Sequence, residues 1–156
     1  MISIDIPGLR NLELDHLVLD FNGTLAADGE LLDGLAHRLA LLANVLAVHV
    51  ITGNTYGDAR EQLGECVADV VCLPPTGQAA AKRDYVTGLG GERVVAIGNG
   101  RNDALMLEQA ALGIAVLGTE GLATEALRAA DVVVRQPADA LDLLLHPKRL
   151  IATLRG

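Results

Sequence analysis

Short apolar runs alternate along this chain with longer stretches in which apolar residues recur every three or four positions. The runs cover residues 16–20, 48–51, 69–73, 94–97, 114–117 and 132–134. Between the first two runs the repeating positions are Leu35, Leu39, Leu42 and Leu46. Spacings of three and four place these side chains on one helix face. The regular alternation predicts an α/β fold with a mainly parallel sheet.

The same pattern predicts the remaining elements. Further helices are expected near residues 55–63, 77–89, 102–111 and 121–130, and over 138–154 with an interruption at Pro147. Two short strands, residues 2–6 and 11–15, flank the turn signal Pro7-Gly8 and predict a small N-terminal β-hairpin. Since no repeat or linker interrupts the 156 residues, we expect one domain over residues 1–156.

Composition narrows the function classes. Apolar residues make up 51% of the chain and aromatic residues 2%, which predicts a core of small aliphatic side chains and excludes disorder. No apolar run approaches the ~20 residues of a membrane span. The net charge of −8 disfavours a nucleic-acid partner, because such partners require basic residues. The N-terminus has no leader pattern, so we expect a cytoplasmic protein.

Two cysteines leave one question open. Five residues separate Cys66 from Cys72, and this spacing is not that of a CxxC metal knuckle. The spacing allows a disulfide. The favoured interpretation is a pair of reduced thiols in the core.

Two candidate sites stand at strand ends. Asp20 opens the segment DFNGTL, and Thr52-Gly53 lies in ITGN. Open α/β sheets bind ligands beyond the carboxyl ends of their strands, where a carboxylate and a hydroxyl would meet a ligand. Taken alone, each has a more ordinary interpretation, namely an aspartate that closes a strand and a common turn.

Two more candidates lie further along the chain. Lys82 follows three alanines and could reach a phosphate as a point charge, although a surface lysine is the favoured interpretation of this residue alone. The segment GNGRNDALML, residues 98–107, follows a strand and opens a helix at Asp103. Aspartate is common at helix starts. A dinucleotide fingerprint is disfavoured, because Asp103 stands where the third glycine would be.

Taken in order, an aspartate, a threonine, a lysine and a Gly-Asn-Asp loop form a more specific pattern. This pattern resembles the haloacid dehalogenase-like (HAD) hydrolase superfamily, and within it the phosphorylation domain of P-type ATPases and their soluble, stand-alone relatives. The likeness runs from about Leu17 to Arg155 and includes residues 98–107, 112–134 and 147–155. The resemblance implies a three-layer Rossmannoid fold with Asp20 on a central strand.

The resemblance also implies a mechanism. Asp20 would attack phosphorus and form an aspartyl-phosphate, which divides one difficult displacement into two easier ones. Thr52, Gly53 and Lys82 would hold the phosphoryl oxygens. The implied partner is a small phosphorylated molecule, and the implied reaction is hydrolysis of a phosphate monoester.

The implied cofactor is Mg²⁺. Its ligands would be the Asp20 carboxylate, the backbone carbonyl of Asn22, and Asn99 and Asp103 of the fourth motif. Mg²⁺ prefers oxygen ligands and neutralises charge that develops on a phosphoryl group.

Three amides depart from the family pattern. Asn22 replaces the second aspartate, which normally protonates the leaving group. Asn99 replaces a metal-binding aspartate, and Asn54 replaces the aspartate of Thr-Gly-Asp. An amide cannot transfer a proton in this way, so we expect a slow phosphatase with weak metal binding. The alternative is a catalytically attenuated phosphate- or metal-binding regulatory protein. A nucleotide-binding module is a weaker third possibility.

The spacing between motifs bears on accessory parts. The gaps of residues 25–51 and 53–81 have room for little more than one helical excursion each, so we expect a capless enzyme that pumps no ions. An open site needs another way to exclude water. The hairpin offers a free edge for pairing, and we therefore expect a homo-oligomer.

Overall fold

Six parallel strands form the central sheet of the computed structural model, which describes residues 1–53, 56–64 and 67–156. The spatial order is β10-β9-β8-β3-β6-β7. The strands are β3 (His16–Asp20), β6 (Ala47–Thr52), β7 (Asp69–Cys72), β8 (Val94–Gly98), β9 (Leu112–Val116) and β10 (Val132–Val134). This order confirms the α/β class and the central position of the strand that ends at Asp20.

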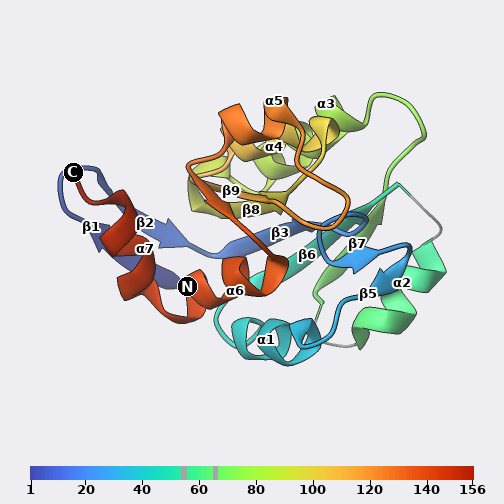
Figure 1. Cartoon of the computed structure of the whole chain (residues 1–156), viewed down its shortest axis with the longest axis horizontal. Coiled ribbons are helices and arrows are strands. Elements are labelled where there is room, and N and C mark those ends of the chain that lie inside the picture. The colour runs from blue at the N-terminus through green and yellow to red at the C-terminus, as the bar shows by residue number, and fades with distance from the viewer. Residues whose placement is uncertain (54–55, 65–66) are drawn as a thin grey trace.

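Helices cover both faces of the sheet (Figure 1). One face carries α3 (Gln78–Gly88), α4 (Ala104–Gln109) and α5 (Thr124–Ala129). The other face carries α1 (Leu35–Leu42), α2 (Tyr56–Leu63) and α6 (Pro137–Leu145). The sheet therefore separates two aliphatic clusters, as expected when both faces of a parallel sheet are buried.

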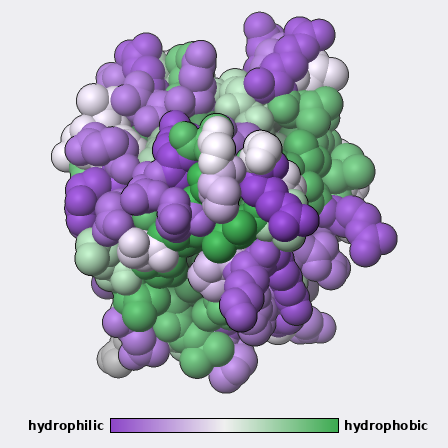
Figure 2. All heavy atoms as spheres, turned by 90° about the vertical axis from the view of Figure 1, so that its left-hand side faces the viewer, coloured by the Kyte–Doolittle hydropathy of each residue, from purple (hydrophilic) through white to green (hydrophobic). Residues whose placement is uncertain are grey.

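The predicted hairpin is present as β1 (Ile2–Ile6) and β2 (Arg10–Leu14). Its apolar side chains alternate toward α7 (Pro147–Leu154), so that Ile4, Leu12 and Leu150 are all buried. At this end of the molecule, hydrophobic patches are interspersed with hydrophilic side chains (Figure 2). The apolar alternation of the hairpin is thus explained by its packing against the chain's own last helix.

Two small features differ from the sequence expectation. A second hairpin, β4 (Ala26–Ala27) with β5 (Glu30–Leu31), follows the Asp20 loop. The helix expected over residues 102–111 begins at Ala104, because residues 101–103 form a 3-10 turn; another such turn spans Gly91–Arg93. Pro147 begins α7 and so divides the helical tail where predicted, since proline suits the first turn of a helix.

A polar network lies between α3 and the sheet. The Tyr85 hydroxyl donates to Asp69 Oδ2 at 3.3 Å and lies 2.9 Å from His49 Nδ1. His49 Nδ1 therefore donates to Tyr85, which leaves His49 Nε2 to accept from His16 Nδ1 at 3.1 Å. Burial, followed by the charge of His16, lowers the pKa of His49, and Asp69 opposes this shift. The network is satisfied with His49 neutral.

Two remaining expectations concern membranes and cysteines. Within the described ranges, no helix has both the length and the apolar character that a membrane crossing needs. Cys72 is exposed, so the expectation of a core thiol is wrong for this residue, which stands at the end of the outermost strand β7. Cys66 lies outside the described residues.

Candidate active site

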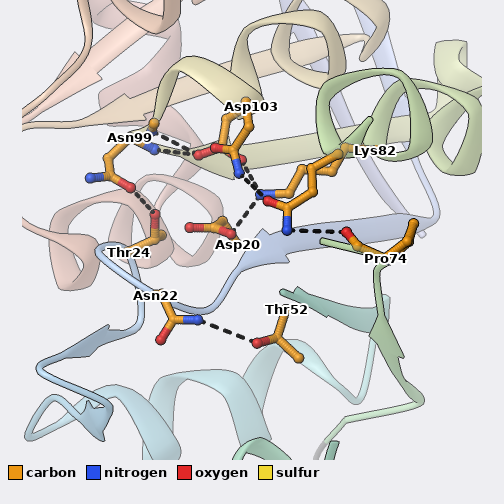
Figure 3. Close-up of polar contacts among 11 residues, drawn as sticks. Asp20, Asn22, Thr24, Thr52, Pro74, Lys82, Asn99 and Asp103 are labelled. Atoms are coloured by element: carbon orange, nitrogen blue, oxygen red, sulfur yellow. Dashed lines mark hydrogen bonds and ion pairs between the residues drawn. The ribbon is translucent and has the colours of Figure 1, made fainter. Parts of the chain in front are cut away.

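Several chain segments meet at the carboxyl edge of the sheet, around the end of β3. Asp20 is the last residue of β3, Thr52 is the last of β6, and Asn99 directly follows β8. Because β3 lies between β6 and β8, these side chains come together although they are distant in sequence. Lys82 reaches the same place from α3 (Figure 3).

Lys82 joins two carboxylates beneath the site. Its Nζ donates to Asp20 Oδ1 at 2.7 Å and to Asp103 Oδ1 at 2.5 Å (Figure 3). The Lys82 side chain is 1% exposed. The surface position favoured for Lys82 alone is therefore wrong. Two carboxylates compensate for the cost of burying the ammonium group.

Asp103 is fully buried, and both of its carboxylate oxygens accept hydrogen bonds from other groups of the protein. Its Oδ2 accepts the backbone N–H groups of Asn99 at 3.0 Å and Gly100 at 2.8 Å, while its Oδ1 accepts from Lys82. A Cβ on Gly98 would lie 2.6 Å from the Asp103 carboxyl carbon, so only glycine leaves room for this arrangement. Asp103 thus positions Lys82 and the loop that carries Asn99.

The charges around Asp20 change its protonation. Burial and then the negative charge of Asp103 raise the pKa of Asp20 to about 7, although Lys82 acts in the opposite direction. The charge of Glu120 contributes a further rise. Burial alone would lower the pKa of Lys82, but Asp20 and Asp103 outweigh it and raise that pKa, so Lys82 stays charged.

Asn22 and Asn99, which replace aspartates of the family pattern, are held by hydrogen bonds. Asn22 Nδ2 donates to Thr52 Oγ1 at 3.3 Å. Asn99 Oδ1 accepts from the Thr24 hydroxyl at 3.2 Å (Figure 3). Asn99 Nδ2 donates to the Gly121 carbonyl at 3.1 Å. These bonds fix which end of the Asn99 amide faces Thr24. Asn54 lies outside the described residues.

A pocket of about 480 Å³ opens above these groups. Its lining includes four residues singled out from the sequence, namely Asp20, Asn22, Gly53 and Asn99. Thr52, Lys82 and Asp103 are buried next to this pocket. A larger pocket, of about 550 Å³ around Leu35, Leu117 and Pro137, contains none of the site residues.

The sequence interpretation missed four lining residues, which are Asp28, Gly29, Gln78 and Glu120. Gly100 and Asn102 also line the pocket and lie in the segment 98–107 that the sequence singled out. Gln78 and Asn102 form one amide pair, with Asn102 Nδ2 donating to Gln78 Oε1 at 2.9 Å. Glu120 lies in the loop after β9, four residues beyond Val116, so attention to the loops that follow the strands could also have found Glu120.

Two known proteins are similar to this chain in sequence, and no family model matches it. An uncharacterized protein of Methanocaldococcus jannaschii, MJ0073, is 50% identical over 64 residues, which cover 41% of this chain and 69% of that protein. The phospholipid-transporting ATPase tat-1 of Caenorhabditis elegans is 34% identical over 91 residues. That match covers 56% of this chain but spans only 8% of the ATPase.

Solved structures extend the likeness to the whole fold. A protein of Vibrio cholerae described as a 3-deoxy-D-manno-octulosonate 8-phosphate phosphatase has a TM-score of 0.71 and 15% identity, covering 94% of this chain and 96% of its own. The Moraxella catarrhalis phosphatase of that name, bound to magnesium, phosphate and KDO, has a TM-score of 0.68 and 17% identity, covering 91% of this chain and 94% of its own. A Legionella pneumophila protein described as a HAD superfamily hydrolase has a TM-score of 0.66 and 20% identity, covering 90% of this chain and 87% of its own. The chain has the HAD superfamily fold and belongs to the same family as the Methanocaldococcus jannaschii protein.

Proposed function

We propose that this protein is a slow, Mg²⁺-dependent phosphatase that hydrolyses a small phosphate monoester through an aspartyl-phosphate on Asp20. One observation carries the proposal. Asp20 ends the central strand, lines the pocket, and is held through Oδ1 by a buried lysine. Its Oδ2 has no hydrogen-bond partner among residues 1–53, 56–64 and 67–156, and is therefore the oxygen available for phosphorus or a metal ion.

The reaction follows from these positions. The bond from an Asp20 oxygen to phosphorus forms as the ester bond breaks, with Lys82 as a fixed positive charge beside the developing negative one. In this proposal, Thr52 and Gly53 hold the phosphoryl oxygens. Water then attacks phosphorus, which releases inorganic phosphate and restores the carboxylate.

Proton transfer is the slow part of this scheme. Asn22 lines the pocket at the position of the family's acid, but its amide donates to Thr52 and carries no transferable proton. The leaving oxygen must take its proton from water. The expected result is a low turnover number and a phosphorylated Asp20 that persists.

The residues fit a magnesium ion with few charged ligands. The donors are all oxygen: the Asp20 carboxylate, the carbonyl of Asn22 and Asn99 Oδ1, the set that Mg²⁺ prefers. Where the structure describes the chain, no three His, Cys, Asp or Glu side chains are grouped to hold a metal by themselves, so the amide and carbonyl oxygens are needed. Asp103 would act on the ion through the Asn99 loop. Bound Mg²⁺ would keep Asp20 ionised and neutralise phosphoryl charge.

The experiment is hydrolysis of an aryl phosphate with and without Mg²⁺. We expect measurable Mg²⁺-dependent turnover by the unchanged protein, a phosphorylated species on Asp20 by intact-mass spectrometry, and background activity for Asp20→Asn. Wild-type turnover by Asp20→Asn would overturn the covalent mechanism. A screen of metabolite phosphates, with sugar-acid phosphates among them, would then identify the substrate.

A second candidate is a regulatory protein that binds phosphate or a metal without turnover. The hydrogen-bonded amides of Asn22 and Asn99 favour it, because both replace groups that speed phosphatases. Binding of Mg²⁺ and phosphate by calorimetry, with no hydrolysis, would support this candidate over the enzyme.

The remaining features are also proposals. We propose one capless domain over residues 1–156. The first gap between motifs supports this proposal, because between β3 and β6 the chain forms only the short hairpin β4–β5 and the helix α1. A homo-oligomer and a cytoplasmic location stay predictions from the sequence.

A further inference from the structure

Glu120 brings a carboxylate to the side of the site where the family pattern has lost one. A Cβ built on Gly23 would lie 2.7 Å from Glu120 Oε2, 2.8 Å from Asn99 Nδ2 and 2.9 Å from Asn99 Oδ1. Both oxygens therefore lie within 3 Å of one point above the loop that follows Asp20. Gly23 has a φ of +77°, a conformation that suits glycine, and the absent side chain leaves that point open.

The turn that carries Glu120 is fixed against the site. Gly121 N–H donates to the Gly118 carbonyl, and the Gly121 carbonyl accepts from the Asn99 amide. Glu120 Oε1 accepts the backbone N–H of Asp28 at 3.4 Å. The turn is thus tied to Asn99 through Gly121, and the Glu120 carboxylate is tied to the β4–β5 hairpin through Asp28.

The charges near this point lack a cation. Asp20, Asp28 and Glu120 all line the pocket, and in the described part of the chain Glu120 makes no ion pair. Asp20 is more than nine-tenths buried, and its Oδ2 lacks a hydrogen-bond partner among those residues. Lys82 compensates Asp20 and Asp103 beneath the pocket but does not reach Glu120. Carboxylates that converge without a cation repel one another, so the pocket favours a positive ligand.

We propose that Glu120 supplies the negative charge that Asn99 no longer provides, and that it holds a divalent cation at Asp20 through the water shell of the ion. Glu120 is then a positioning residue for the metal. Mg²⁺ retains several of its waters when proteins bind it, so a carboxylate beside the direct ligands can accept hydrogen bonds from them. This inference rests on the proposed function, because it assumes a metal at Asp20.

The test is Mg²⁺ titration of metal-free protein by calorimetry in phosphate-free buffer, with MgCl₂ as the probe. Glu120→Gln keeps the shape and removes the charge. Loss of a group that holds a metal through its outer shell weakens binding about 10- to 100-fold, and we expect that range here. Glu108→Gln, an exposed glutamate on α4 outside the pocket, is the matched control and should bind Mg²⁺ as the unchanged protein does.

A second variant tests whether residues 120 and 99 both contribute to binding the same metal ion. Asn99→Asp restores the family's carboxylate, so adding it to Glu120→Gln should recover most of the lost affinity. If Glu120→Gln binds Mg²⁺ within twofold of the unchanged protein while aryl phosphate hydrolysis persists, the inference is wrong and the proposed function stands. Failure of Asn99→Asp to recover affinity would also overturn the inference. No saturable Mg²⁺ binding by the unchanged protein would overturn both.

Discussion

Replacing Lys82 by methionine tests the buried charge cluster most directly. Methionine keeps the length and flexibility of the side chain but removes the ammonium group that lies 2.7 Å from Asp20 Oδ1 and 2.5 Å from Asp103 Oδ1. Two carboxylate oxygens would then face each other at no more than about 5 Å. At an effective dielectric of about 20, two unit charges at that separation repel by roughly 3 kcal/mol, and Asp20, whose pKa is already raised to about 7, relieves this repulsion by taking up a proton, which also requires energy at pH 7.5.

The expected cost is large because the cluster is buried. Removing one partner of a buried ion pair costs about 3–5 kcal/mol, and here the lysine serves two partners. The free energy of unfolding of a domain is about 5–15 kcal/mol, so Lys82→Met should lose a large share of it. A cation beside Asp20 partly replaces the missing charge, and saturating Mg²⁺ should therefore recover some stability.

The assay is urea unfolding at pH 7.5, in EDTA and in saturating MgCl₂. Lys148, the chain's other lysine, is exposed on α7, and Lys148→Met provides a control that should stay within about 0.5 kcal/mol of the unchanged protein. A Lys82→Met protein that unfolds within 1 kcal/mol of the control would refute the reasoning, since Lys82 could not then be compensating both carboxylates.

Three further predictions follow from other contacts. Asn99→Asp loses the donor to the Gly121 carbonyl, so it should lower the melting temperature in EDTA. Added Mg²⁺ should raise the melting temperature of this variant by more than that of the unchanged protein. An equal or smaller rise would show that residue 99 does not face the metal. Because the pKa of His49 lies below its ordinary 6.5, the unfolded chain takes up that proton first, and stability is lost as the pH falls below 6.5. Unfolding between pH 7.5 and 5.5 should show this slope, at most about 1.4 kcal/mol per pH unit, and His49→Gln should flatten it; equal slopes would contradict the assignment. Self-association is checked by light scattering, where a mass near 16.3 kDa at micromolar concentration would contradict the expected oligomer.

The sequence predicts best those helices and strands whose apolar residues recur with a clear period. The buried strands and the leucine face of α1 extend over enough residues for the pattern to appear. The β4–β5 hairpin was missed because strands of two residues show no alternation. Its turn nevertheless carries a signal, since Asp28 and Gly29 both have positive φ, and an Asp-Gly pair is typical of tight hairpins.

The site was predictable where chemistry lies at strand ends, and less so where it depends on tertiary contacts. Asp20, Thr52 and Asn99 follow from the strand-end rule together with the family pattern. The burial of Lys82 does not follow from its helix, because the charges that compensate it come from β3 and from the turn before α4. Local sequence cannot distinguish a lysine with two distant carboxylate partners from one at the surface.

The pattern of kept and replaced groups has a physical logic. Asp20, Lys82 and Asp103 depend on one another, because removing Lys82 leaves two buried carboxylates without their cation, and removing either carboxylate leaves Lys82 with one partner instead of two. Asn99 lies outside that cluster, and its amide donates to a carbonyl, which a carboxylate cannot do. The site therefore retains the charged groups that would form an aspartyl-phosphate and replaces those that would hasten its breakdown. With an aryl phosphate, whose leaving group departs without a proton from the protein, such an enzyme should show a first turnover that is faster than the hydrolysis that follows, and the size of this burst measures how much Asp20 is phosphorylated.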